Sequence, residues 1–257
     1  MDRRLFVAAG VASSIFPFAH AQSQVLSTAI NRTARCRMLS QRAVKAYGLI
    51  TLKLNSENTK PVLARTVKEM RETIAEVDSY NRGRSFASSR AEFSAQLLPF
   101  LNELSNEPSS AKLLAVSAQS DKVLDSANAM VVVLESFAGS STSKLINMAG
   151  RQRMLTQRIA KNYVLQEAKV DGGTSKAAIE KDKNLFLESN KQLGAAPIST
   201  PAIKESLEKG LGLFNGYIDA VAQSNNIETI SRISETILVE LDNQTLLYEK
   251  ALASVIG

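Results

Sequence analysis

The chain carries the same 18-residue segment twice, and this repeat limits the folds that it can adopt. Residues 30–47 read INRTARCRMLSQRAVKAY and residues 146–163 read INMAGRQRMLTQRIAKNY, with ten identical positions at a spacing of 116 residues. Two copies of about 115 residues are each large enough to bury a core of their own. The identical positions are mostly polar or cationic, whereas a duplicated scaffold would mainly keep apolar core positions. The repeat therefore predicts a duplicated function as well as a duplicated fold.

The first 21 residues have the pattern of an export signal. Two arginines precede a short apolar run that ends in Ala19-His20-Ala21, a small-x-small cleavage site. The run is short and interrupted by Pro17, and no later stretch approaches the roughly 20 apolar residues of a membrane helix. We therefore expect a signal peptide at 1–21 and a soluble, exported, periplasmic protein with no transmembrane anchor. The general and the twin-arginine export routes both agree with this signal.

The composition of the remaining chain argues against an enzyme. Removal of the signal takes away His20, the only histidine, so no imidazole is left as a general base or metal ligand. The single cysteine, Cys36, cannot form an internal disulfide or a thiolate metal cage. We expect no cofactor and no metal. The net charge of +6 suits an anionic ligand, but 5% aromatics and the lack of a lysine or arginine block argue against nucleic-acid binding.

Turn-forming residues divide the chain into eight helix-length segments with almost none of the alternation that is typical of strands. We expect helices at about 23–57, 61–83, 87–107, 110–138, 142–170, 174–194, 201–224 and 226–256. Thr200 and Pro201 form an N-cap followed by a first-turn proline, while Pro99 should kink or split the third helix. Four helices a copy predict an all-α fold of two tandem up-down-up-down four-helix bundles, with domains at 22–140 and 141–257.

The segment Gly139 to Ser143 decides how the two bundles are placed. If it forms a sharp turn, the copies lie side by side; if it is absorbed into a longer helix, they lie end to end. Glycine followed by serine and threonine is typical of a helix end and a new N-cap, which favours the sharp turn. The first helices of the two copies would then meet as a pseudo-dimer.

Each first helix carries one narrow stripe of small, apolar and cationic side chains at helical spacing. The two stripes consist of Ile30, Ala34, Arg37, Gln41, Val44 and Gly48, and of Ile146, Gly150, Arg153, Gln157, Ala160 and Val164. Small residues at 34 and 150 would let the helices approach closely, so that Arg37 and Arg153 face each other. Two guanidinium groups in a partly desolvated seam repel each other, and a small planar oxyanion would join them.

The other repeated cations lie on neighbouring faces of the same helices. These residues are Arg35, Arg42, Lys45, Arg151, Arg158 and Lys161. They would either steer an anion inward or pair with acidic residues of adjacent helices.

The segments ARCRMLSQR and AGRQRMLTQR resemble the signature of the PilJ/NarX-type sensor domain. Members of this family are four-helix bundles in the extracytoplasmic parts of chemoreceptors and of nitrate/nitrite sensor kinases. In the nitrate-binding members, the ligand lies between the first helices of two subunits. The resemblance rests on about 18 residues in each copy and otherwise on the number of helices.

The resemblance also implies which residues bind the ligand. The arginine that grips nitrate, the glycine whose backbone approaches the anion, and the arginine that closes the motif fall on Arg37 and Arg153, on Gly150, and on Arg42 and Arg158. The first copy departs from the pattern because Ala34 replaces the glycine. Its additional methyl group leaves room for an asymmetric or weakened site.

We therefore expect an exported sensor that holds a small inorganic oxyanion, most simply nitrate or nitrite, between its two repeats and catalyses no reaction. We expect no signalling module after the second repeat, so a membrane-bound sensor kinase or chemoreceptor is the expected partner. The alternative is a structural or adaptor protein of the cell envelope whose arginines bind carboxylates. Acidic partners for both Arg37 and Arg153 would favour the adaptor, and their absence would favour a ligand.

Overall fold

The computed structural model describes residues 16–54, 56–78, 83–138, 141–224 and 226–256. Within these ranges the chain forms helices and no strand, so the expected all-α fold is confirmed. The elements are α1 (Phe16–Thr51), α2 (Ser56–Asp78), α3 (Gly83–Leu104), the short 3₁₀ helix η1 (Ser110–Lys112), α4 (Leu113–Ala138), α5 (Ser141–Glu167), α6 (Ser175–Ala195), α7 (Pro201–Ala222) and α8 (Ile227–Ile256).

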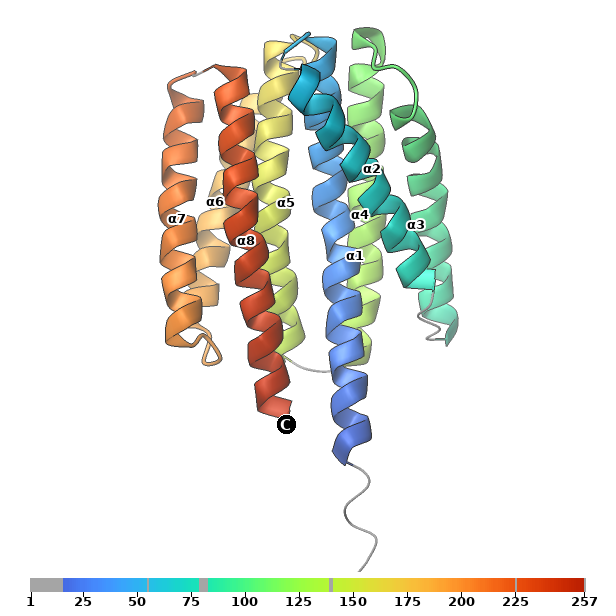
Figure 1. The fold of residues 1–257 in the computed structure, drawn as a ribbon, viewed down its shortest axis with the longest axis vertical. Coiled ribbons are helices and arrows are strands. Elements are labelled where there is room, and N and C mark those ends of the chain that lie inside the picture. The colour runs from blue at the N-terminus through green and yellow to red at the C-terminus, as the bar shows by residue number, and fades with distance from the viewer. Residues whose placement is uncertain (1–15, 55, 79–82, 139–140, 225, 257) are drawn as a thin grey trace, which may run out of the picture.

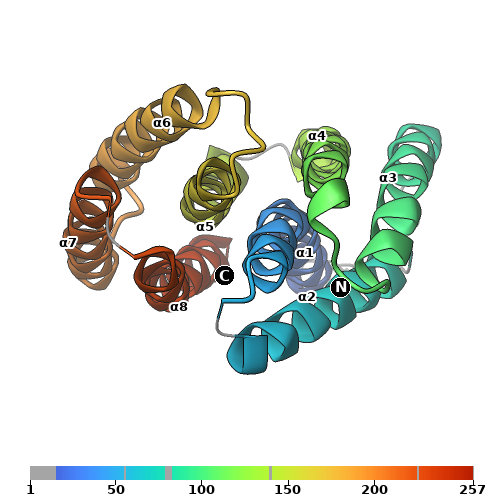
Figure 2. The same cartoon turned by 90° about the horizontal axis from the view of Figure 1, so that it is seen from above.

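The two copies form four-helix bundles that lie side by side. Helices α1 to α4 make the first bundle and α5 to α8 the second, and the chain reverses direction from each helix to the next (Figure 1). The first helices, α1 and α5, run parallel through the middle of the molecule (Figure 2). Helices α4 and α8 flank this central pair on opposite sides. The predicted pseudo-dimer of two bundles is thus confirmed.

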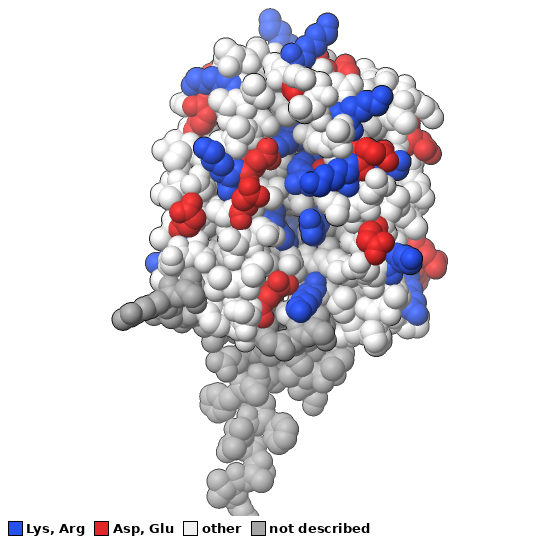
Figure 3. All heavy atoms as spheres, turned by 180° about the vertical axis from the view of Figure 1, so that it is seen from behind, with Lys and Arg blue, Asp and Glu red and all other residues white. Residues whose placement is uncertain are grey.

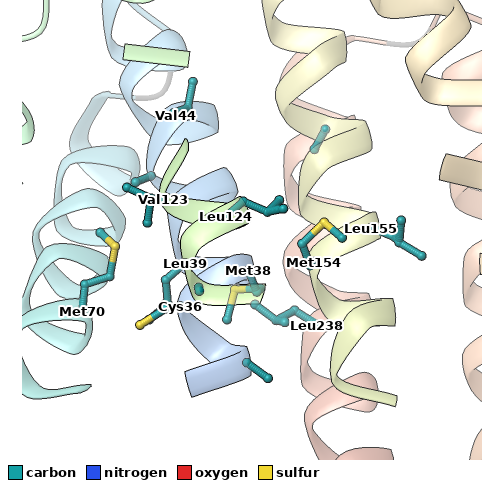
Figure 4. Close-up of a cluster of buried hydrophobic side chains, with 14 of the residues drawn as sticks. Cys36, Met38, Leu39, Val44, Met70, Val123, Leu124, Met154, Leu155 and Leu238 are labelled. Carbon is teal, nitrogen blue, oxygen red and sulfur yellow. The ribbon is translucent and has the colours of Figure 1, made fainter. Parts of the chain in front are cut away.

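The Arg-Met-Leu segment that the two repeats share supplies the centre of the core. Met38, Leu39, Met154 and Leu155 are all buried, and Figure 4 shows Met38 and Met154 between the two central helices. Cys36 is also fully buried, and burial raises the pKa of its thiol to about 12. A thiol in this state is unreactive, in agreement with a packing role.

Two prolines that we expected to begin or interrupt a helix lie inside continuous helices. The turn expected just before Pro61 does not form, because α2 begins at Ser56 and continues through this proline. Pro99 likewise lies inside α3 and does not split it. Each proline removes one backbone hydrogen bond, but Leu97 and Phe100 are fully buried beside Pro99 and hold the helix in place by packing.

The first helix of each copy ends in the same turn. Lys53 and Lys169 take the left-handed conformation, with φ of 59° and 57°. The N–H of the next residue then donates to the carbonyl five residues back, at 3.0 Å in the first copy and 3.2 Å in the second. This is the Schellman arrangement. It ends α1 at Thr51, six residues earlier than we expected from the sequence.

The expected signal peptide is only partly described. Residues 1–15 lie outside the described residues, and α1 begins at Phe16 and runs through the expected cleavage site at Ala21. None of the described helices combines the length and the apolar content that a membrane crossing requires.

Two contacts between α1 and α5 join residues that are equivalent in the two repeats. A Cβ placed on Gly150 would lie 3.7 Å from the Cβ of Ala34, and a Cβ on Gly48 would overlap the Cγ1 of Val164. Each pair is separated by 116 residues, the spacing of the repeat. The two predicted stripes therefore face each other across a pseudo-twofold axis.

The contact at Gly48 predicts a result specific to this seam. Gly48→Ala should lower the free energy of unfolding by about 1–3 kcal/mol, because the added methyl group overpacks against Val164. The loss should be smaller when Val164→Ala is also present. Gly212→Ala on α7 is the control, since its Cβ meets nothing within 4 Å and should stabilise the helix. Urea denaturation of these three variants and of Val164→Ala alone measures this. Equal gains at both glycines would contradict the close approach.

Candidate functional site

Arg37 is buried in the seam between α1 and α5 and binds only neutral oxygen atoms. Its Nη1 donates to Oδ1 of Asn128 on α4 at 2.9 Å, and its Nη2 donates to Oδ1 of Asn147 on α5 at 2.6 Å. Its Nε approaches the carbonyl oxygen of Ala34 at 3.4 Å. Among the residues that the structure describes, Arg37 makes no ion pair. A buried cation without a carboxylate is an unusual arrangement.

Arg153 occupies the equivalent position on α5 but has an acidic partner. Its Nη2 donates to Oδ1 of Asn31 at 2.6 Å, and its Nη1 donates to Oδ1 of Asp242 on α8 at 2.7 Å. The same Asp242 oxygen also accepts a hydrogen bond from Nη1 of Arg35 at 2.9 Å. The Nε of Arg153 is buried and has no partner in the described part of the chain. The adjacent Gly150 leaves space for this guanidinium, because a Cβ there would lie 3.0 Å from Nη2.

The asparagine contacts cross between the repeats. Asn31 and Asn147 are the second residues of the two repeated segments, 116 residues apart. Each accepts a hydrogen bond from the arginine of the opposite repeat, and both distances are 2.6 Å. Arg37 and Arg153 therefore make the same hydrogen bond to an asparagine on the two sides of the axis.

The fourth helices are equivalent as well, with a spacing of 114 residues. Gln41 donates to the carbonyl of Ser120 on α4, and its counterpart Gln157 donates to the carbonyl of Ser234 on α8. In this register, Asn128 of α4 corresponds to Asp242 of α8. At Nη1 the two halves of the site thus differ in one respect: Arg37 meets an amide where Arg153 meets a carboxylate.

Electrostatics reflect this difference. Burial, together with the charges of Arg153 and Arg151, lowers the pKa of Arg37 to about 9, although the charge of Glu135 opposes the shift. Burial also lowers the pKa of Arg153, but there Asp242 opposes the shift. The positive charge of Arg37 is therefore the less compensated of the two.

A carboxylate lies behind each asparagine. Glu135 on α4 is hydrogen-bonded to Asn147, and its counterpart Glu249 on α8 is hydrogen-bonded to Asn31. Burial raises the pKa of both carboxyl groups. Because the two rows of arginine, asparagine and glutamate match, they do not distinguish one half of the site from the other.

The two remaining motif arginines lie in ion pairs. Arg42 donates to both oxygens of Glu235 on α8, at 3.0 and 2.6 Å. Arg158 makes a two-pronged ion pair with Asp182 on α6. Five residues along a helix turn a side chain by about 140° from Arg37 or Arg153, which places both arginines outside the seam stripe. Two guanidinium nitrogens of Arg42 and of Arg158 are thus already hydrogen-bonded to a carboxylate.

The repeated lysines line two pockets between the copies. A pocket of about 470 Å³ includes Lys45 and Glu235, and its counterpart of about 400 Å³ includes Lys161 and Asp121. Lys45 is ion-paired with Glu235 at 2.6 Å and Lys161 with Asp121 at 2.7 Å. The charge of each lysine is therefore compensated by a carboxylate inside the chain.

The sequence pointed to the arginines and missed their partners. Asn31 and Asn147 are identical in the two repeats, so the repeat contained a signal for them. Asn128 and Asp242 lie in the fourth helices, outside the repeated segment, and only the packing of α4 and α8 brings them to the seam.

Comparison with known proteins agrees with the duplicated architecture. The chain matches the family model of the type IV pili methyl-accepting chemotaxis transducer N-terminal domain, PilJ, over residues 18–130 and again over residues 137–231. No curated protein and no solved structure matches it. The two matches cover most of the chain, and each includes one repeated segment with its seam arginine. The chain therefore belongs to the PilJ family and carries two tandem copies of its domain.

Proposed function

We propose that this PilJ-family protein is an exported sensor that binds a small oxyanion, nitrate or nitrite, between α1 and α5. The family description supports a sensory domain of a chemotaxis transducer, and sensing requires no catalytic group. The proposal includes a signal peptide at 1–21, domains at 22–140 and 141–257, and a periplasmic location. A membrane-bound chemoreceptor or sensor kinase would receive the signal.

The observation that carries the proposal is Arg37. This residue is 2% exposed, its hydrogen-bond acceptors are neutral, and a second buried arginine repels it. An anion that reached this group would relieve the cost of burying the charge. The rigid fork of donors on a guanidinium matches the planar oxygens of nitrate or nitrite.

Binding in the seam would be sensed directly by both repeats. Arg37 is anchored on α1, while its acceptor Asn147 is on α5. An anion that competes for this guanidinium would change a contact between the two central helices. A small shift of one helix against the other is the kind of change that a partner protein can detect.

The adaptor alternative is favoured by the other arginines. Arg153, Arg42 and Arg158 all have carboxylate partners inside the chain. A purely structural role explains these three ion pairs without a ligand. It gives no reason for the hydrogen bonds of Arg37, which all go to neutral oxygen atoms.

Thermal unfolding with different anions separates the two functions. At matched ionic strength, nitrate or nitrite should raise Tm saturably, by about 5–10 °C at a concentration of a hundred times Kd. Arg37→Ala should abolish this rise and Arg153→Ala should weaken it. Arg71→Ala is the control, because this exposed arginine lies away from the seam on α2. If nitrate, chloride, sulfate and phosphate act alike and Arg37→Ala responds as wild type, the protein is an adaptor.

A further inference from the structure

We infer that the anion site is one-sided: a single carboxylate-like monoanion binds beside Asn128, between Arg37 and Arg151. In the other half of the molecule, the side chain of Asp242 occupies the equivalent position. This inference rests on the proposed function and specifies the place, the charge and the shape of the ligand. In the second half, an aspartate carboxylate takes the place that the anion takes in the first half.

The Asp242 carboxylate shows what such a site looks like when it is filled. Its Oδ1 joins two arginines from different repeats, Arg153 on α5 at 2.7 Å and Arg35 on α1 at 2.9 Å. One carboxylate thus bridges two guanidinium groups at the edge of the seam, and Arg35 has a second acidic partner in Glu69. Both distances are typical of charge-assisted hydrogen bonds.

The equivalent place in the first half lacks this charge. By the spacings of the repeats, Arg153, Arg35 and Asp242 correspond to Arg37, Arg151 and Asn128. Nη1 of Arg37 still reaches the side chain at this position, with a 2.9 Å hydrogen bond to Asn128. Arg151 has no hydrogen bond or ion pair with any residue that the structure describes, although its charge acts on Arg37. Two cations therefore share a position that offers them one neutral amide oxygen.

The position beside Asn128 is reachable from solvent. Asn128 and Arg151 are exposed, while Arg37 lies buried behind them. Helices α4 and α5 lie on the side turned away from the viewer in Figure 1. Figure 3 shows this face, with lysine and arginine side chains gathered along its middle. An anion can enter between α4 and α5 without separating the two bundles.

The filled half also indicates the class of ligand. One carboxylate, Asp242, bridges Arg153 and Arg35, while Arg35 also pairs with Glu69 on α2. A planar group with one negative charge is therefore the matching occupant of the bridging position in the other half. Nitrate, nitrite, formate and acetate share this chemistry, whereas sulfate and phosphate bring a second charge and a tetrahedral shape. Glu135 and Glu249 lie near both halves alike and do not change this comparison.

Exchange of the two fourth-helix residues tests the inference. Isothermal titration of the purified protein with sodium nitrate should give one site per chain. Asn128→Asp should weaken nitrate binding at least tenfold, because it supplies an internal carboxylate, and should raise Tm without any anion. Asp242→Asn should open a second site and change the stoichiometry from one to two. Both substitutions are nearly isosteric, and circular dichroism verifies the fold.

A second pair of variants addresses the arginines. Arg151→Gln, at an exposed position, should weaken nitrate binding about tenfold, whereas the matched Arg35→Gln should leave it unchanged. The location is wrong, and the proposed function stands, if Asn128→Asp and Arg151→Gln bind nitrate as wild type while Arg37→Ala does not. If formate or acetate binds and nitrate does not, the location stands and the nitrate assignment falls. If none of these anions binds the wild-type protein, both proposals fail.

Discussion

Glu235→Gln is expected to lower the free energy of unfolding by about 3 kcal/mol, the largest loss that the ion pairs of the molecule predict. Glu235 lies on α8 and compensates two cations of the opposite repeat. Its carboxylate accepts hydrogen bonds from Arg42 at 3.0 and 2.6 Å and from Lys45 at 2.6 Å. Arg42 and Lys45 are both almost fully buried. An amide in this place would leave two buried positive charges without a counter-charge.

The loss should appear as a decrease in Tm of about 6–12 °C for a chain of this size. Asp121→Asn is the matched control, because Asp121 occupies the equivalent position on α4. It compensates one cation, Lys161, and its own side chain is half exposed. We expect it to cost about 1 kcal/mol or less, as for other solvent-exposed pairs. Equal losses in the two variants would contradict the asymmetry between the two pockets.

The same carboxylate predicts a dependence on pH. Burial alone would raise the pKa of Glu235, but Lys45 and Arg42 together lower it to about 2. A group whose pKa is lower in the folded state stabilises the fold above its unfolded pKa and loses this effect as the pH falls. The difference in stability between wild type and Glu235→Gln should therefore shrink between about pH 4.5 and pH 2. A difference that stays constant over this range would show that the ion pairs do not form.

The sequence predicted the architecture well because the repeat lies at the contact between the copies. The small residues Ala34 and Gly150 and the buried Arg37 and Arg153 are all in the repeated segment, and helical periodicity puts them on one face. Once two four-helix bundles were expected, a parallel pair of first helices followed from the short linker.

The partners of the arginines could not be predicted in the same way. Asn128 and Asp242 contribute to the seam only through the register of α4 and α8, which depends on packing along the whole bundle. The same is true of Arg42 and Arg158, which are equivalent in the motif but have different ion-pair partners. Arg42 binds Glu235 of the opposite repeat, and Arg158 binds Asp182 of its own, because Thr66 stands at the position equivalent to Asp182.

Local signals also competed with packing at the helix ends. Proline at position 61 suggested a helix start, but α2 begins five residues earlier. The actual reversal is at Lys53, a residue with no intrinsic preference for positive φ. Such a turn is set by the Schellman hydrogen bond and the apolar residues around it, which a residue-by-residue interpretation does not capture.

Arg37→Met is expected to raise the free energy of unfolding by about 1–3 kcal/mol in the absence of anions. Most substitutions of a buried residue destabilise a protein, so the expected sign is itself informative. Burial lowers the pKa of Arg37 to about 9, which leaves the guanidinium charged at neutral pH and carries a cost in the folded state. Methionine fills a similar volume without this charge. Water can satisfy the two released acceptors, because Asn128 is exposed and Asn147 is partly exposed.

Arg153→Met is the control for this prediction, since it removes an equally buried arginine that has an ion pair. We expect it to lower the free energy of unfolding by about 1–2 kcal/mol, because Asp242 loses one of its two cations. Chemical denaturation of both variants gives the two signs directly. A binding residue that destabilises the free protein is the common cost of a functional site, whereas a structural residue stabilises it. If Arg37→Met and Arg153→Met lose stability equally, Arg37 is a structural residue and the seam has no need of an anion.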